Sequence, residues 1–228
     1  MNDKTQRIIA ARMRLKARFE ARSAATPSVS DAKPLGHGPA NRHGMPRIPV
    51  GQVETKKWPV LDLGKHPVVS QEDWRLTIDG AVNESRVLTW ADFMGLEQVD
   101  DISDFHCVTT WSKCDMPWRG VRFSSLAALV DPDGAATHVM CHAYDGYTTN
   151  VSLEEALKDD VLLVHTWEGR PLPIEHGGPV RMITPQLYAW KGAKWISRIE
   201  FMTQNRLGFW EERGYSDTAY PWRDDRYS

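Results

Sequence analysis

Residues 104–120 read "DFHCVTTWSKCDMPWRG" and carry two of the three cysteines in the chain. The first half of this stretch is rich in β-prone residues, so we expect Cys107 to lie near the end of a strand, directly after His106. A single cysteine is most often a small buried hydrophobe. The residues alone leave three interpretations of Cys107 open: a packing residue, a redox thiol or a metal ligand.

Spacing disfavours several of the possible chemistries. Cys107, Cys114, Cys141 and His142 could be counted as four zinc ligands, but no C-x₂-C pair is present. A redox pair of Cys107 with Cys114 lacks the C-x-x-C spacing. The sequence contains no G-x-S-x-G elbow and no glycine-rich phosphate loop, which disfavours a serine hydrolase and a nucleotide-binding enzyme.

The composition is that of a soluble globular protein of 228 residues with a net charge of -2. This charge gives no reason to expect nucleic acid as a partner. No apolar run reaches the roughly 18 residues of a transmembrane helix, and no secretory signal is recognisable. The three cysteines, an odd number, are typical of a reducing compartment. We therefore predict a cytoplasmic protein without a transmembrane segment.

The chain divides by composition into three parts. Residues 1–25 are predicted to be a basic helical arm, with apolar side chains at Ile8, Ile9, Met13, Leu15 and Phe19. The arm is either a surface helix or a docking element for an acidic partner or a membrane surface. Residues 26–68 are rich in proline and glycine and are predicted to wrap the domain or line a site. Residues 69–228 are predicted to be the catalytic domain, with residues 47–68 contributing to it.

The rest of the sequence mixes short strands and short helices, which indicates an α+β domain with long loops. Further helices are predicted at 89–96, 123–130 and 152–158, and strands at 74–82, 104–110, 137–144, 161–167, 178–184 and 193–202. Thr89 is a predicted helix cap, and Ser152 with Glu155 a predicted capping box. Ten tryptophans are many for this length, and most are expected in the core or in the walls of a cleft.

A second concentration of polar residues lies in "PLPIEHGGPVRMITPQLYAWKGAKW", residues 171–195. It combines His176, Arg181, Lys194 and several glycines. Guanidinium, ammonium and exposed backbone N–H groups together suit an anionic ligand such as a phosphate. The alternative is ordinary turn chemistry with a surface salt bridge.

Several ordered motifs resemble the molybdopterin-binding domain of the sulfite oxidase family, in particular its short prokaryotic oxidoreductases. They are "HCVTTWS…PWRGVRFSSL", "DGYTTNVSLEEAL", the run from 161 to 201 and "GFWEERGYSDTAYPW". The resemblance covers roughly residues 47–224. It implies a mixed-sheet α+β fold and an enzyme with one molybdenum-pterin per chain. The metal would cycle between Mo(VI) and Mo(IV) while an oxygen atom moves to or from a small substrate. No haem-attachment C-x-x-C-H motif is present.

The resemblance also implies roles for particular residues. Cys107 would bind the molybdenum, because its thiolate is a soft ligand that suits a redox-active metal. Catalytic roles fall to Cys107, His106 and His165, and the expected cofactor-binding residues are His142, His176, Arg181, Gly192, Ala193, Lys194 and Gln52. Tyr188 and Trp111 are expected pocket walls, and Cys114 and Cys141 packing residues. Replacing Arg181 with alanine is expected to release the cofactor without unfolding the protein.

Two departures from the family bear on the substrate. Sulfite-oxidising members carry basic residues before the ligand cysteine, where this chain has Asp104-Phe105-His106. His165 stands where those members carry a tyrosine. Histidines are weaker, pH-dependent substitutes in a pocket for an oxyanion. Reduction of an S-oxide or N-oxide and sulfite-like oxidation both stay open. A cofactor carrier or assembly protein is the alternative, and an electron-transfer partner would dock near the basic arm.

Overall fold

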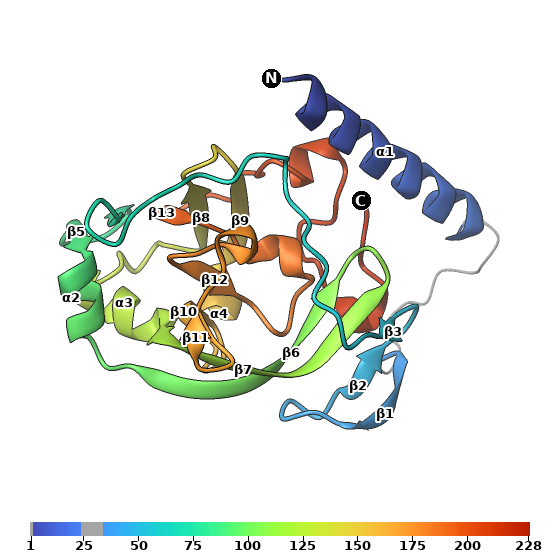
Figure 1. The fold of residues 1–228 in the computed structure, drawn as a ribbon, viewed down its shortest axis with the longest axis horizontal. Coiled ribbons are helices and arrows are strands. Elements are labelled where there is room, and N and C mark those ends of the chain that lie inside the picture. Colours follow the sequence, from blue (N-terminus) through green and yellow to red (C-terminus); the bar gives the residue numbers. More distant parts are fainter. Residues whose placement is uncertain (1, 24–33) are drawn as a thin grey trace.

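The computed structural model describes residues 2–23 and 34–228, and within them the strands form mixed sheets. The larger sheet runs β11-β10-β7-β3, with β12 also paired to β10 and β6 also paired to β7. Its strands are β3 (Val53–Glu54), β6 (Val99–Cys107), β7 (Trp111–Arg122), β10 (Leu162–Trp167), β11 (Arg170–Pro171) and β12 (Arg181–Ile183). The long β6–β7 hairpin holds residues 104–120 and forms one side of the molecule (Figure 1).

A second sheet has the order β5-β4-β13-β8-β9. It consists of β4 (Arg75–Gly80), β5 (Arg86–Thr89), β8 (His138–Ala143), β9 (Thr148–Ser152) and β13 (Ile196–Met202). The β4–β13 pair is parallel and the other pairs are antiparallel. The small ribbon of β1 (Gly36–Ala40) and β2 (Pro46–Pro49) lies beside these sheets. The fold is therefore the predicted mixed-sheet α+β architecture.

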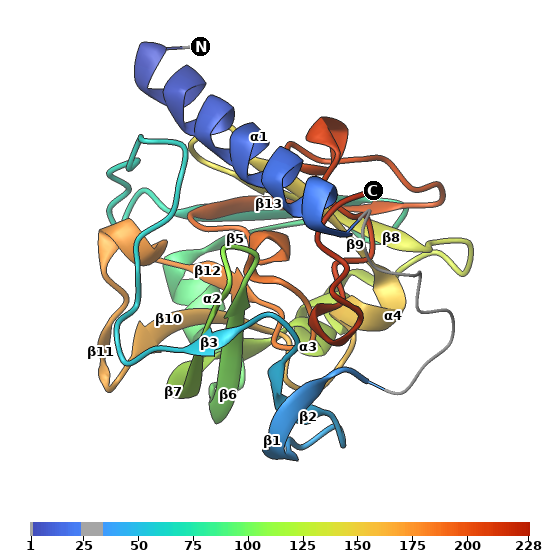
Figure 2. The same ribbon diagram turned by 90° about the vertical axis from the view of Figure 1, so that its right-hand side faces the viewer.

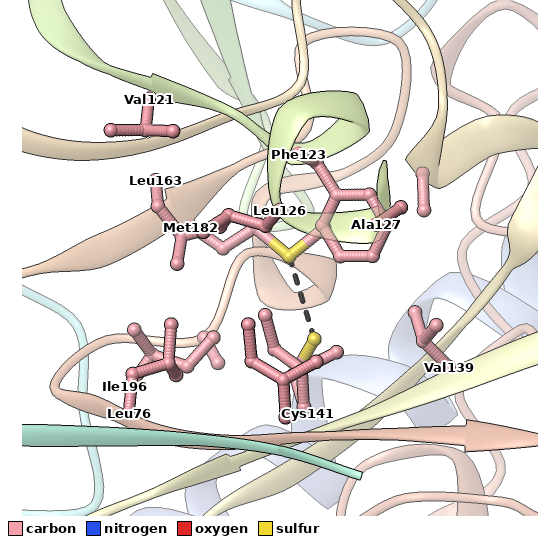
Figure 3. Close-up of a cluster of buried hydrophobic side chains, with 14 of the residues drawn as sticks. Leu76, Val121, Phe123, Leu126, Ala127, Val139, Cys141, Leu163, Met182 and Ile196 are labelled. Atoms are coloured by element: carbon pink, nitrogen blue, oxygen red, sulfur yellow. Dashed lines mark hydrogen bonds between the residues drawn. The ribbon is translucent and has the colours of Figure 1, made fainter. Parts of the chain in front are cut away.

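The main hydrophobic core is built from both larger sheets and from helix α3 (Phe123–Val130). Cys141 of β8 lies in this core, with its Sγ 3.4 Å from Sδ of Met182 on β12 (Figure 3). Burial raises the pKa of the Cys141 thiol to about 12, so it packs as a neutral side chain. Cys141 therefore packs in the core, as expected from the sequence.

The remaining helices are short. They are α2 (Trp90–Gly95), α4 (Leu153–Ala156), η1 (Ile174–His176), η2 (Ala189–Lys191), η3 (Glu211–Arg213) and η4 (Pro221–Arg223). The side chains of Thr89 and Ser152 accept hydrogen bonds from the backbone N–H groups of Asp92 and Glu155, so both predicted N-caps are present. The capping box predicted for Ser152 is incomplete, because the Glu155 carboxylate binds Lys158 and Tyr220 instead. A complete box forms at Thr89. The helix expected at 123–130 forms over those residues.

The N-terminal helix α1 (Asp3–Ser23) lies against the C-terminal segment of the same chain (Figures 1 and 2). The predicted division at residues 25 and 26 falls outside the described residues. In the part of the proline-rich segment that is described, β1 and β2 pair only with each other, which is compatible with Pro39, Pro46 and Pro49.

The sequence missed the full length of the β6–β7 hairpin. The strand predicted at 104–110 begins at Val99 and ends at Cys107, because Thr110 takes a left-handed conformation with φ of 74° and turns the chain. β7 passes through Pro117, a residue that argues against a strand interior. The turn places Cys107 directly opposite Trp111.

Candidate functional site

A cavity opens beside the end of β6, with about 800 Å³ of empty space when the solvent at its mouth is included. Its walls combine aromatic side chains, charged side chains and a single thiol. The lining residues are Arg12, Trp58, Pro59, Leu61, Asp62, Leu63, Phe105, Cys107, Val108, Trp111, Asp145, Tyr147, His176, Arg181, Ala189, Trp190, Gly192, Lys194, Trp195, Trp210 and Tyr215.

Cys107 reaches this cavity because side chains alternate along a strand. Phe105 and Cys107 line the cavity, whereas His106 between them lies on the other face of β6. The Cys107 thiol is 6% exposed and lies 3.1 Å from the hydroxyl of Thr109. Burial raises its pKa above the ordinary value, and the hydrogen bond from Thr109 acts in the opposite direction. The free thiol is therefore neutral near pH 7, and a metal ion would have to displace its proton.

Two cations, Arg181 and Lys194, line the same cavity. Arg181 is buried and donates hydrogen bonds from Nη1 to the carbonyl of His176 (3.0 Å) and from Nη2 to that of Gly192 (3.1 Å). Lys194 Nζ donates to the carbonyl of Glu175 at 2.7 Å. Burial, together with the charge of Arg181, lowers the pKa of Lys194 to about 7. Two positive charges close together in a partly desolvated site favour an anionic ligand.

The backbone approaches this cation pair closely at two glycines. A Cβ on Gly192 would lie 2.5 Å from the carbonyl oxygen of Met182. Gly177 has a φ of 112°, and a Cβ there would lie 2.9 Å from Cβ of Arg181. Glycine is required at both positions, because any side chain would push the strands apart. We call Gly177, Arg181, Gly192 and Lys194 the cation cradle.

The proline-rich segment supplies one wall of the cavity. Trp58 stacks on His176 with ring centroids 3.7 Å apart, and Cζ of Arg181 lies 5.8 Å from the centroid of the Trp58 ring. Burial, with the charges of Lys194 and Arg181, lowers the pKa of His176 to about 4. His176 is therefore a neutral ring near pH 7, and it serves as a flat wall beside the cation cradle.

Comparison with known proteins shows the family to which the chain belongs. The sequence model of the family described as "Oxidoreductase molybdopterin binding domain" matches residues 63–210. This chain belongs to that family. A relative of similar length, the uncharacterized oxidoreductase YuiH of Bacillus subtilis, is 37% identical over 80% of this chain and 92% of its own length.

Other members of the molybdopterin-binding family are longer. The putative protein-methionine-sulfoxide reductase subunit YedZ1 of Azospira oryzae is 29% identical over 65% of this chain and 56% of its own. The catalytic subunit MsrP of Pseudomonas syringae, also named a protein-methionine-sulfoxide reductase, is 27% identical over 61% of this chain and 47% of its own. The chain thus spans about half the length of these two relatives.

The fold matches that of a solved structure, the sulfane dehydrogenase SoxCD of Paracoccus pantotrophus, with a TM-score of 0.56. The match is 21% identical and covers 61% of this chain and 40% of that one. The chain is thus a molybdopterin-dependent oxidoreductase with a sulfite oxidase-type fold. No helix within residues 2–23 or 34–228 is both long and apolar enough to cross a bilayer.

The cavity fits the cofactor that the family binds. Cys107 provides a soft sulfur ligand, the type preferred by redox-active metals that bind thiolates. Arg181, Gly192 and Lys194 of the cation cradle line the same cavity, and a guanidinium and an ammonium group suit the phosphate of a molybdopterin. Two carboxylates, Asp62 at 3.9 Å from Lys194 Nζ and Asp145, also line the cavity and partly compensate the charge of Lys194.

The structure places the other two predicted catalytic residues away from the cavity. His106 is 1% exposed, and its Nδ1 lies 2.8 Å from the Ser112 hydroxyl on the opposite face of β6. His165 of β10 lies 3.0 Å from Oε1 of Gln98. Burial lowers the pKa of both rings, to about 4 for His106. Neither imidazole lines the cavity, so neither is positioned to meet a substrate there directly.

Three predicted cofactor-binding residues also lie outside the lining. His142 follows the core residue Cys141 on β8, so it faces the other side of the sheet, where its Nε2 lies 3.1 Å from Glu200. Ala193 is buried in the main core. Gln52 lies behind Cys107 and donates a hydrogen bond to its carbonyl at 3.1 Å, which makes it a support for the cysteine backbone.

Of the two predicted pocket walls, Trp111 lines the cavity, whereas Tyr188 is buried behind Trp190 and stacks on it at 5.5 Å. Trp58, Trp111, Trp190, Trp195 and Trp210 are all lining residues, in agreement with the expectation that tryptophans form cleft walls. Arg12, Tyr147 and Tyr215 were not predicted to belong to the site. They come from segments remote in sequence, and no local pattern marks them.

A buried ion pair fixes one of these walls. Lys191 Nζ lies 2.8 Å from Oε1 of Glu211 and 2.9 Å from the carbonyl of Asn150. The same Glu211 oxygen accepts hydrogen bonds from Nε1 of Trp190 at 3.0 Å and from the hydroxyl of Thr149 at 2.8 Å. The pair is fully desolvated, and it orients the Trp190 indole at the cavity wall.

Proposed function

We propose that this oxidoreductase reduces a small S-oxide by two-electron oxygen-atom transfer at a molybdenum-pterin bound to Cys107. The single observation that carries the proposal is the shared cavity, which the buried thiol of Cys107, the buried guanidinium of Arg181 and the partly buried ammonium of Lys194 all line. When bound, the molybdenum-pterin supplies the two-electron redox chemistry. The protein contributes the ligand, the anion site and the shape of the pocket.

Each group of residues has a separate task in this proposal. Cys107 gives up its proton and holds the metal, while Gln52 fixes the carbonyl of the same residue. Arg181 and Lys194 hold the anionic end of the pterin by charge-assisted hydrogen bonds. The aromatic walls exclude water from the space beside the thiol, which strengthens each polar contact inside it.

The character of the walls supports an S-oxide over sulfite. The residues that cluster with Cys107 are largely aromatic, among them Trp111, Trp190, Trp210 and Tyr215. Arg181 and Lys194 are assigned to the pterin, and the remaining cation in the lining is Arg12. A doubly charged oxyanion would need more positive charge than one guanidinium, whereas a neutral sulfoxide needs apolar walls and a donor for its oxygen.

The overall reaction balances as R₂SO + 2H⁺ + 2e⁻ → R₂S + H₂O. The electrons come from an external reduced electron carrier, and the protons come from solvent. Relatives named protein-methionine-sulfoxide reductases also favour this direction.

Steady-state assays of molybdenum-loaded protein test the proposal. We expect oxidation of reduced benzyl viologen to depend on methionine sulfoxide, and the rate with sulfite and ferricyanide to be much lower. Faster turnover of sulfite would reverse the proposed direction. Protein that retains molybdenum but turns over neither substrate would instead indicate a cofactor carrier.

A further inference from the structure

We infer that Arg12 of α1 and Tyr215 form an oxygen-binding pair in the cavity, placed to donate hydrogen bonds to the S–O oxygen of a substrate beside Cys107. This inference rests on the proposed function and identifies the residues that meet the substrate. Arg12 lies outside residues 63–210, the range that the family model matches.

Helix α1 lies across one face of the molecule (Figure 2) and contacts the rest of the chain at several points along its length. Near its start, the Thr5 hydroxyl donates a hydrogen bond to the carbonyl of Leu63 at 2.8 Å. In the middle, Ile9 and Met13 pack against the cluster that contains Cys107 and Tyr215. Near its end, Phe19 meets Tyr227 edge to face at 5.4 Å. Thr5, Ile9 and Met13 are four residues apart and Phe19 follows six residues later, which at 3.6 residues per turn places all of them on one face of the helix.

Arg12 lies on this docked face and is one of the lining residues. In the described residues it makes no hydrogen bond and no ion pair, unlike Arg7 and Lys16 of the same helix, which pair with Asp3 and Glu20. A half-buried guanidinium without a partner is unfavourable until an acceptor arrives. The cavity therefore contains a cation on the Cys107 side whose donors are available.

Tyr215 supplies the second donor. Its side chain is 2% exposed, and within the described residues its hydroxyl makes no hydrogen bond of ordinary geometry, with the Tyr227 hydroxyl as a polar neighbour. The rings of Trp190, Trp210 and Tyr227 surround it. Burial raises its pKa above the ordinary value, so it stays a neutral O–H donor near pH 7. A buried hydroxyl without an acceptor in a lining residue is a binding group in need of a ligand.

The two donors suit the proposed chemistry. A sulfoxide oxygen carries a large partial negative charge and has two lone pairs, so it can accept one hydrogen bond from each donor. A sulfide product lacks that oxygen and accepts only weakly, which favours its release. Sulfite presents the same S–O acceptor with a full negative charge. The salt dependence of the dissociation constant separates the sulfoxide from sulfite, because ionic screening weakens the binding of the charged ligand.

The test is a titration of intrinsic tryptophan fluorescence with methionine sulfoxide and, separately, with sulfite, on molybdenum-loaded protein. Trp111, Trp190 and Trp210 line the cavity and report occupancy without turnover. Arg12→Gln is compared with Arg14→Gln, an equal charge change on the exposed face of the same helix. Tyr215→Phe is compared with Tyr144→Phe, the same change at an exposed tyrosine that does not line the cavity.

We expect Arg12→Gln to raise the dissociation constant about tenfold or more, and Tyr215→Phe several-fold, for the ligand that binds. Both control variants should stay within about twofold of the wild type. Tyr215→Phe should also keep or raise the melting temperature, because it removes a hydroxyl that has no protein partner. A purely structural Tyr215 would instead lower the melting temperature and leave the affinity unchanged.

Equal affinities for Arg12→Gln and Arg14→Gln, or a wild type that binds neither ligand, would overturn the inference. Binding that depends on Arg12 without any turnover would leave the oxygen-binding pair in place and refute the proposed reaction. Turnover that neither Arg12→Gln nor Tyr215→Phe changes would support the proposed reaction and refute the oxygen-binding pair.

Discussion

The indole of Trp58 lies flat on the imidazole of His176, with ring centroids 3.7 Å apart and planes 4° from parallel. Trp58 comes from the proline-rich segment, and His176 from the turn that leads into β12. The contact closes one side of the cavity and covers Arg181, whose Cζ lies 5.8 Å from the centroid of the Trp58 ring. The cavity is therefore completed by a segment that precedes residues 63–210.

Replacing Trp58 with leucine should reduce cofactor retention while leaving the fold intact. The variant loses the stack on His176 and the cation–π contact with Arg181, and it opens the cavity to water. We expect a several-fold lower molybdenum content after gel filtration, measured by mass spectrometry of the metal, with an unchanged circular dichroism spectrum. Val60→Ala is the matched control, because Val60 lies two residues away, is 42% exposed and does not line the cavity. Equal metal loss in both variants would contradict the role of Trp58.

Arg181→Ala should lower stability as well as cofactor retention, which modifies the expectation from the sequence. Three nitrogens of this buried guanidinium donate to the carbonyls of His176, Met182 and Gly192, and the variant leaves those acceptors unpaired. We expect a loss of about 2–5 kcal/mol in the free energy of unfolding, measured with urea on cofactor-free protein. Arg170→Ala, at an exposed position on β11, should cost less than about 0.5 kcal/mol. Wild-type stability of Arg181→Ala would show that the guanidinium serves the cofactor alone.

The pH dependence of stability should reveal the buried charge of Lys194. Burial lowers its folded-state pKa from 10.5 to about 7, so between these values the unfolded state binds more protons than the folded state. Stability attributable to this group therefore rises with pH from about 7 to 10.5, by at most about 1.4 kcal/mol per pH unit. Cofactor-free wild type should gain stability relative to Lys194→Met over this range.

Inorganic phosphate provides a second test of the same residue. An anion beside Lys194 stabilises the ammonium and raises its pKa, so 50 mM phosphate should reduce the pH-dependent difference between wild type and Lys194→Met. A difference that is independent of pH, or that phosphate leaves unchanged, would contradict an anion site at Lys194.

The buried pair of Lys191 and Glu211 should behave as a single unit. Lys191→Met leaves a desolvated carboxylate without its cation, and we expect a loss of about 3–5 kcal/mol in urea unfolding. The double variant Lys191→Met/Glu211→Gln should be more stable than Lys191→Met alone, because it removes the unpaired charge. The tryptophan emission spectrum of the double variant should change little, because the amide oxygen of a glutamine can still accept the hydrogen bond from the Trp190 indole. If the losses of Lys191→Met and Glu211→Gln, measured separately, add up to the loss of the double variant, the two side chains are not coupled.

The parts of this site that the sequence predicted were those with a local signal. Cys107 ends a β-prone run, and Arg181, Gly192 and Lys194 lie in one glycine-rich stretch that reads as an anion site. Strand alternation explains the misplaced histidines. His106 precedes Cys107 on β6, and His142 follows Cys141 on β8. Successive side chains on a strand point to opposite faces, so each histidine points away from its neighbouring cysteine. Their side-chain direction depends on register, which neither spacing nor composition reveals.

The remaining residues depend on tertiary packing. Arg12 reaches the cavity because α1 docks on the C-terminal segment, about 200 residues away along the chain. The sequence showed the apolar face of this helix but could not show whether a partner, a membrane or the same chain covers it. Tyr215 and Trp58 likewise enter from segments without regular alternation. The fold class was easier to predict, because short strands, caps and turns carry local signals.

The central claim is that Cys107 binds molybdenum, and the X-ray absorption spectrum at the molybdenum K-edge tests it most directly. The wild type is predicted to contain about one molybdenum per chain, and Cys107→Ser to show one sulfur ligand fewer in the extended fine structure. Cys114→Ser is the control, because Cys114 lies on β7 outside the cavity and should leave the spectrum unchanged. A Cys107→Ser spectrum with the sulfur coordination of the wild type, or folded wild type that takes up no molybdenum, would contradict the account.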